Sequence, residues 1–204
     1  MGLTDWEVYK TNAGQVFAIE VTAPLHGSGS FKFNRGGTAG TEQNIRRAQT
    51  PRAFTSGRMR WLFATTVSAS ATFGGCVFQQ SQADLTAAGT GYYACIALAV
   101  NPAQNVLQLR RMTAGLPTST VLFQGTNQFT LNINTPVALE IEWVLDIANL
   151  GGIRFNFKRG TADNFSNLVN EPGITNVVST TTILQTSVGE GPASRLPADP
   201  NNHL

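Results

Sequence analysis

Residues 139–146 read LEIEWVLD and place several carboxylates along one predicted strand. Glu140 and Glu142 are two residues apart, so in a strand their side chains project from the same face, and Asp146 follows. Two carboxyl groups about 5–5.5 Å apart can hydrolyse a glycosidic bond with retention, one acting as nucleophile and the other as general acid. The alternative is an ordinary strand with one polar face.

The apolar residues of the same stretch favour the ordinary strand. Leu139, Ile141 and Trp143 occupy one face, and Glu140 and Glu142 occupy the other. A strand buried on one face and wet on the other accounts for all of these residues. This interpretation predicts that both glutamates face solvent or a partner.

Composition excludes several classes of protein. Of the 204 residues, 42% are hydrophobic, which is enough for a sizeable core. The net charge of +2 is too small to indicate nucleic-acid binding, and no apolar run approaches the roughly 20 residues needed to span a membrane. The start, MGLTDWEVYK, lacks the apolar core of a secretory signal, so we expect synthesis and folding in a cytoplasm.

No metal or other cofactor is expected. The two cysteines, Cys76 and Cys95, have only His26 and His203 as further zinc ligands. If the runs that carry the cysteines pair so that residue numbers sum to 171, Cys76 lies opposite Cys95; direct cross-strand bridges are strained, so we expect free thiols. A calcium site is not expected because the loop acids are scattered, at Asp84, Asp146, Asp163 and Glu171.

Apolar and polar residues alternate with period two along most of the chain. This pattern, punctuated by Gly, Pro and Asn, predicts an all-β, antiparallel two-sheet β-sandwich. Expected strands lie at about 17–21, 31–33, 59–63, 72–80, 91–100, 105–112, 119–124, 129–133, 137–145, 153–157 and 177–185.

Two segments depart from this alternation. Residues 34–57 read as a long arginine-containing loop, and residues 187–204 contain Pro192, Pro197 and Pro200 with little hydrophobicity. We therefore expect one sandwich domain over residues 1–186 and an extended C-terminal arm over 187–204.

The predicted hairpin at 72–99 is apolar on both faces. Val77 and Tyr92 represent one face, and Cys76, Phe78 and Tyr93 the other. A strand of a sandwich normally exposes one face to solvent. Because both faces of this hairpin are apolar, we expect the face that does not point into the core to be covered, either by the loop 34–57 or by a partner.

The order of the strands resembles the concanavalin A-like jelly roll of lectins, laminin-G-like modules and family 16 glucanases. That resemblance implies two stacked, curved sheets, with glycans bound on the concave face or at a rim of loops and calcium held by loop carboxylates in some members. It is carried by SGRMRWLF (56–63), GGCVFQ (74–79), GTGYYACIAL (89–98), NVLQLRRM (105–112), PVALEIEWVLD (136–146) and GIRFNFKRG (152–160).

The comparison with family 16 enzymes bears on catalysis. Their strand reads Glu, apolar, Asp, apolar, apolar, Glu, sometimes with one more residue before the last acid. Aligned here, Glu140 takes the place of the nucleophile and Glu142 that of the middle acid, while the general acid falls on Leu145, or on Asp146 if the strand carries a bulge. Leu145 has no proton to donate, so we expect no enzymatic activity.

The sequence therefore favours a non-catalytic interaction module. Similar jelly rolls are widespread in accessory proteins of tailed-bacteriophage virions. We expect a capsid-decoration or tail component, assembled in the host cytoplasm, that contacts other virion proteins and copies of itself. The alternatives are a lectin-like adhesin that binds a surface glycan and a family-16-like hydrolase that uses Glu140. Arginine is enriched in protein interfaces, and the expected partner-binding residues are Arg46, Arg47, Arg52, Val188, Arg195, Leu196 and Leu204.

Overall fold

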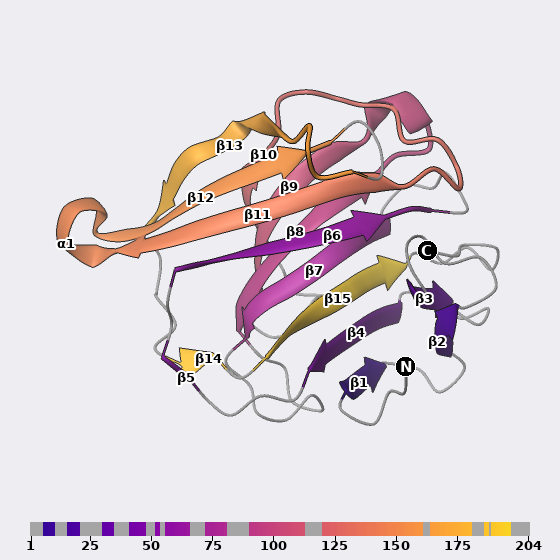
Figure 1. Ribbon diagram of the computed structural model, residues 1–204, viewed down its shortest axis with the longest axis horizontal. Coiled ribbons are helices and arrows are strands. Elements are labelled where there is room, and N and C mark those ends of the chain that lie inside the picture. The colour runs from indigo at the N-terminus through magenta and orange to yellow at the C-terminus, as the bar shows by residue number, and fades with distance from the viewer. Residues whose placement is uncertain are drawn as a thin grey trace.

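In the computed structural model, two antiparallel β-sheets pack face to face (Figure 1). The structure describes residues 6–10, 16–20, 30–34, 41–47, 52–53, 56–65, 72–80, 90–112, 120–160, 164–180, 186–187 and 189–196. Within these ranges one sheet has seven strands and the other has four. The predicted all-β, antiparallel two-sheet sandwich is confirmed.

Strand order follows the hydrogen-bonded ladders. From edge to edge, the seven-stranded sheet contains β1 (Trp6–Lys10), β4 (Thr41–Arg47), β15 (Gly189–Leu196), β7 (Thr72–Gln80), β8 (Gly91–Leu98), β9 (Val106–Met112) and β10 (Thr120–Gln124). The four-stranded sheet contains β13 (Val169–Ser179), β12 (Gly152–Arg159), β11 (Val137–Asp146) and β6 (Gly57–Phe63). Two small pairs complete the described strands: β2 (Val16–Glu20) with β3 (Ser30–Asn34), and β5 (Arg52–Ala53) with β14 (Thr186–Ser187).

Helical structure in the described ranges is limited to α1 (Ile147–Leu150) and the short 3-10 turn η1 (Pro102–Gln104). Neither of these helices is long and apolar enough to cross a membrane.

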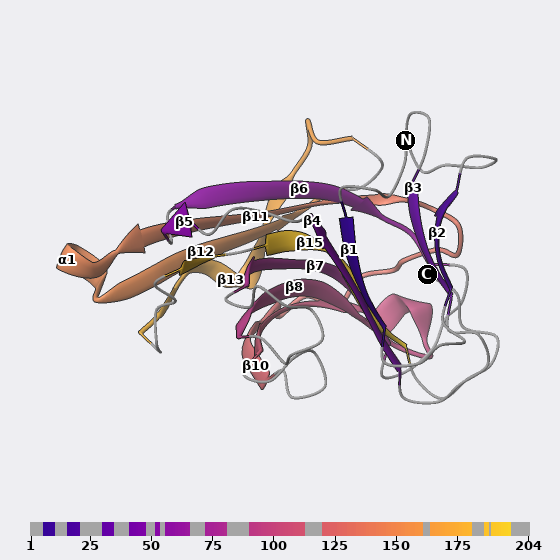
Figure 2. The same cartoon turned by 90° about the horizontal axis from the view of Figure 1, so that it is seen from below.

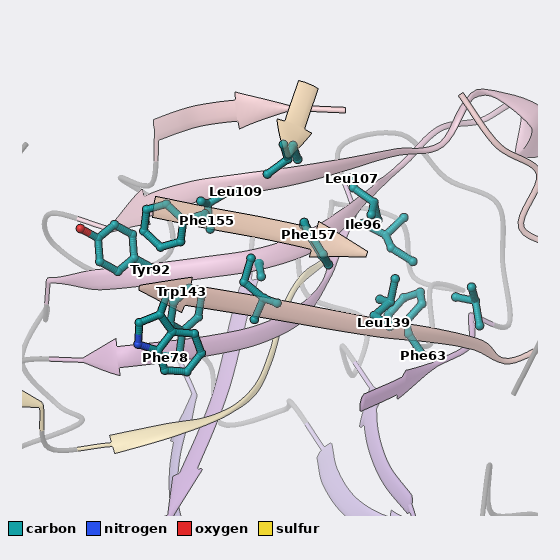
Figure 3. Close-up of a cluster of buried hydrophobic side chains, with 14 of the residues drawn as sticks. Phe63, Phe78, Tyr92, Ile96, Leu107, Leu109, Leu139, Trp143, Phe155 and Phe157 are labelled. Atoms are coloured by element: carbon teal, nitrogen blue, oxygen red, sulfur yellow. The ribbon is translucent and has the colours of Figure 1, made fainter. Parts of the chain in front are cut away.

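The core lies between the two sheets, which Figure 2 shows as two layers, with β6 and β11 in one and β7 and β8 in the other. Four aromatic side chains connect the layers (Figure 3): Phe78 and Tyr92 from the larger sheet, Trp143 and Phe155 from the smaller. The ring centroids of Phe78 and Trp143 are 4.6 Å apart, and those of Tyr92 and Phe155 are 5.1 Å apart. Such pairs contribute about 0.5–1.5 kcal/mol each beyond the burial of their area.

Strand β11 has the predicted inward face. Leu139, Ile141 and Trp143 are all buried in this core. The prediction for the opposite face is wrong at one position, because Glu140 is only 1% exposed.

The pairing of β7 with β8 differs by one residue from the predicted register. Cys76 lies opposite Ala94, and Cys95 lies opposite Gly75. Because paired residues share a face and neighbours alternate, the two cysteines project from opposite faces of the sheet. Neither cysteine forms a disulfide in the structure.

The second face of this hairpin is covered, as its composition predicts. Tyr93 and Cys95 have exposed fractions of 1% and 0%. On the neighbouring β9, Gln108 and Arg110 are also buried, and Arg110 Nη1 donates to Gln108 Oε1 at 2.7 Å. That residues 34–57 or a partner provide this cover stays a prediction.

The predicted loop at 34–57 contains two strands. Residues 41–47 form β4, which pairs with β1 and β15, and residues 52–53 form β5. Thr41–Arg47, TEQNIRR, is almost entirely polar, so the apolar alternation that signals a half-buried strand is missing there.

The predicted C-terminal arm is wrong for residues 189–196, which form β15 between β4 and β7. The ladder with β4 begins at Ala193, so at Pro192 the strand pairs with β7 alone. That edge-like position tolerates a residue without an N–H. Residues 197–204, with Pro197 and Pro200, lie outside the described residues.

Candidate functional site

A charged cluster occupies the outer face of the four-stranded sheet, around Glu140. The register of this sheet places Arg60 of β6 and Lys158 of β12 directly opposite Glu140. Two residues further along the same face, Arg58 lies opposite Glu142. Opposite charges on directly paired residues attract, so the strand pairing itself assembles this cluster.

Both oxygens of the Glu140 carboxylate are occupied. Lys158 Nζ donates to Glu140 Oε1 at 2.7 Å, and Arg60 Nε donates a short hydrogen bond to Oε2. Lys158 Nζ is also 2.7 Å from Glu142 Oε2, so this lysine bridges the two glutamates. Arg58 is more distant, with its Nε 3.9 Å from Glu140 Oε2.

These contacts determine the charge state of Glu140. Burial alone raises the pKa of a carboxyl group, but the hydrogen bonds and positive charges of Lys158 and Arg60 outweigh it and lower the pKa of Glu140. Burial also tends to lower the pKa of Lys158, yet the hydrogen bonds to Glu140 and Glu142 raise it overall. Glu140 is therefore held as an anion, with Lys158 bonded to one carboxylate oxygen and Arg60 to the other.

A pocket of about 550 Å³ opens over this cluster. Arg60, Glu140 and Lys158 line it from the three strands. Phe165, Ser166 and residues 168–170 line it from the segment before β13 and from the first two residues of that strand. The guanidinium carbon of Arg60 is 5.8 Å from the centre of the Phe165 ring, within the range of a cation–π contact. Sequence reasoning identified Glu140 but missed Arg60, Lys158 and Phe165 as its neighbours.

The catalytic arrangement considered from sequence is not assembled around Asp146. Strand β11 pairs with β6 and β12 without a register shift, so the bulge required by that alignment is absent from this strand. In a regular strand, a separation of six residues places the Cα atoms of Glu140 and Asp146 about 20 Å apart. Their side chains are too short to bring the two carboxyl groups to the separation of about 5–5.5 Å that retaining hydrolysis needs.

A second buried acid, Glu171, lies near the ends of β10 and β13. Its Oε2 is 3.8 Å from Arg159 Nε, and its Oε1 accepts from the backbone N–H of Asn127 at 3.3 Å. Burial raises the pKa of Glu171, against the opposing effects of the Asn127 N–H and the Arg159 charge. The Arg159 guanidinium also lies over the Phe129 ring, 4.2 Å from its centre.

Among the described residues, no cluster of three or more His, Cys, Asp or Glu side chains is arranged to hold a metal ion. Asp84 and Asp163, two of the acids considered for calcium, lie outside those residues.

The predicted partner-binding residues are dispersed over the described strands. Arg46 and Arg47 lie at one end of β4, opposite Glu7 and Trp6 of β1. Arg195 and Leu196 of β15 lie near the other end of β4, opposite Glu42 and Thr41. Arg52 lies on β5, opposite Ser187, while Val188 and Leu204 are outside the described residues. Their role in partner binding stays a prediction.

Comparisons with known proteins bear on the fold. No family model and no curated protein matches the chain. Three solved structures match, all of the Emp46p carbohydrate recognition domain. The potassium-bound form has a TM-score of 0.55 at 11% identity and covers 98% of this chain and 85% of that domain. The metal-free form and a point mutant of the same domain match over the same shares at 11% identity, with TM-scores of 0.49.

The likeness to the potassium-bound form agrees with the layers and ladders described above. The chain has a concanavalin A-like β-sandwich fold, as its resemblance to that superfamily implies. None of these comparisons supports a bacteriophage virion protein in particular.

Proposed function

We propose that this protein is a non-catalytic, lectin-like module that binds carbohydrate. The observation that carries the proposal is the likeness of its fold to a carbohydrate recognition domain over 98% of the chain. The sequence pattern is compatible with a virion structural role and with glycan binding, and the likeness to a carbohydrate recognition domain favours glycan binding. The virion role, with its virion partners and self-association, stays a prediction.

The chemistry of Glu140 supports the absence of catalysis. Its carboxylate is held by two cations, and Asp146 is too distant to complete a retaining pair. A hydrolase that uses Glu140 would also need this group to attack a sugar, whereas both of its oxygens are already bonded.

A glycan array probed with the whole chain tests the proposal. We expect saturable binding to a subset of glycans, and competition by the same glycan free in solution. Multivalent display raises the apparent affinity of weak sites and makes the test sensitive. A folded protein, verified by circular dichroism, that binds none of the glycans would overturn the proposal.

A parallel assay addresses catalysis. Wild type and Glu140→Gln are incubated with β-glucans, and new reducing ends are measured. We expect no product from either protein. Product from wild type that is lost in Glu140→Gln would establish the hydrolase alternative instead.

A further inference from the structure

We propose that the pocket over Glu140 binds the carboxylate of an acidic sugar residue, with Arg60 as the residue that contacts it. This inference rests on the proposed function and specifies its ligand class. The pocket is defined by Arg60, Glu140, Lys158, Phe165, Ser166 and Asn170, together with the intervening residues 168–169. The pocket is shallow and open to solvent, so its lining side chains are accessible to one residue of a longer chain of sugars.

The donors of Arg60 are only partly used. Its Nε bonds to Glu140, while its two terminal nitrogens have no hydrogen-bond partner among the residues that the structure describes. The side chain is 43% exposed, so these nitrogens are accessible. A guanidinium group offers them as a fork that matches a carboxylate in two parallel hydrogen bonds.

Glu140 acts as a positioning residue for this fork. It lies between Arg60 and Lys158 in the strand register and holds both side chains by hydrogen bonds. A side chain whose orientation is fixed before binding loses less conformational entropy when the ligand arrives. The buried carboxylate therefore orients Arg60 without occupying its outward nitrogens.

The charge of the pocket selects for an anion. Arg58, Arg60 and Lys158 contribute three positive charges to the cluster and Glu140 and Glu142 two negative charges, which leaves one net positive charge around the pocket. A neutral sugar does not compensate this charge, whereas a carboxylate does.

The remaining walls suit a sugar ring. Phe165 presents an aromatic ring beside Arg60, and aromatic faces pack against the apolar faces of rings. Ser166 and Asn170 supply a hydroxyl and an amide, which both donate and accept hydrogen bonds to sugar hydroxyls. An anion-binding fork with an aromatic wall and neutral polar groups fits a uronic acid or another carboxylated sugar.

Isothermal titration calorimetry on the whole chain tests this inference. Three probes are oligosaccharides of matched length: an oligouronate, its neutral counterpart and a sulfated oligosaccharide. The fourth probe is inorganic phosphate. We expect the oligouronate to bind most tightly and its affinity to fall with salt. Tighter binding of the sulfated probe, or equal binding of phosphate, would overturn the assignment to a carboxylated sugar.

Variants of Arg60 locate the site. Arg60→Gln should weaken oligouronate binding at least about tenfold, and Arg60→Lys should give an intermediate loss because it keeps the charge but not the fork. If Arg60→Gln does not fold, the Arg60→Lys comparison still decides. Arg154→Gln, on the same sheet but outside the pocket, is the matched control and should bind as wild type does.

The outcomes separate this inference from the proposed function. Glycan binding that is confined to neutral sugars, or that is unchanged in Arg60→Gln, keeps the lectin-like function and overturns this pocket as its site. The absence of binding to every glycan overturns both.

Discussion

At the scale of single residues, Glu140 shows how a sheet can bury a charge. An isolated carboxylate in a nearly solvent-free position is unstable unless it is paired and hydrogen-bonded. Here the two strands that flank β11 each contribute one cation at the directly opposite position, so each oxygen of Glu140 has a donor. Alternation in the sequence predicts which face Glu140 occupies, but it does not predict that neighbouring side chains cover that face.

Replacing Glu140 with Gln should destabilise the protein by about 1–3 kcal/mol, because Arg60 and Lys158 lose their shared counter-charge. This exceeds the small effect expected of a solvent-facing glutamate. Chemical denaturation of both proteins measures the difference. Glu142→Gln is the matched control, and because Glu142 is 29% exposed its substitution should cost less than about 1 kcal/mol. Equal losses in the two variants would contradict the special role of Glu140.

The pKa shifts of the two buried glutamates predict opposite effects of pH. The folded-state pKa of Glu140 is lowered, so its contribution to stability is complete above about pH 4.5 and is lost as the pH falls through the folded-state pKa. The pKa of Glu171 is raised, so its contribution decreases as the pH rises from about 4.5 through its folded-state pKa.

Denaturation midpoints from about pH 3 to about pH 7 test both signs. The penalty of Glu140→Gln should shrink on the acid side of this range. Glu171→Gln should lose less stability than wild type when the pH rises from about 4 to about 7. A constant Glu140→Gln penalty over the whole range would show that its ionised form does not stabilise the fold.

Truncating a side chain should cost much more unfolding free energy on the inner face of β11 than on its outer face. Trp143 is 4% exposed and stacks on Phe78, so Trp143→Ala should cost about 3–5 kcal/mol in unfolding free energy. Val144 lies on the outer face and is 36% exposed, so Val144→Ala should stay within about 0.5 kcal/mol of wild type. Thermal and urea unfolding compare the two, and similar losses would reverse the assigned faces.

At the scale of elements, strand β8 explains why a register can be predicted only approximately. Period-two alternation specifies register when one face of a strand is polar, since a slip by one residue exchanges the faces. Gly91–Leu98 is buried along nearly its whole length, on both faces. A register with Cys95 opposite Cys76 and one with Cys95 opposite Gly75 are then equally compatible with the sequence pattern.

The observed register predicts how the thiols react. Cys76 and Cys95 project from opposite faces, so no bridge forms between them within one sheet. In the folded protein both should resist alkylation, because both are buried and burial raises the pKa of the Cys95 thiol. After unfolding without reductant, mass spectrometry should show two labels per chain. A species that carries none would indicate a disulfide.

At residues 129–133 the sequence pattern predicts a strand that the structure does not contain. Alternation in this segment predicts a strand, and Phe129 and Leu131 are indeed buried. However, only one isolated bridge, from Phe129 to Asn105, pairs it with another segment among the described residues. Its other backbone hydrogen bonds do not form a ladder. The N–H of Leu131, for example, donates a single hydrogen bond to the carbonyl oxygen of Pro102 at 3.1 Å. Alternation reports burial here, not ladder formation.

At the scale of the whole molecule, local patterns predict the two-sheet architecture and most of the strands, but not the partners of those strands. Glu140 meets Arg60 across 80 positions of sequence, so the charged cluster becomes visible only once β6, β11 and β12 are adjacent. In the same way, β15 lies between β4 and β7, which are far from it in sequence. No local signal specifies either arrangement, because both follow from long-range pairing.

The position of β15 makes a strong prediction for truncation. Deleting residues 187–204 removes a strand that pairs with four residues of β4 and with six of β7. Each backbone hydrogen bond contributes about 0.5–1.5 kcal/mol net, and a typical domain is stable by only about 5–15 kcal/mol. The deletion also separates β1 and β4 from the rest of the seven-stranded sheet. We therefore expect the truncated protein to lose its cooperative thermal transition, measured by circular dichroism and calorimetry.

Deleting only 197–204 keeps both ladders of β15 and serves as the matched control, which should retain a cooperative transition. A protein that lacks 187–204, melts as wild type does and has lost only its self-association would instead restore the interpretation of this segment as an arm that grips a neighbouring subunit.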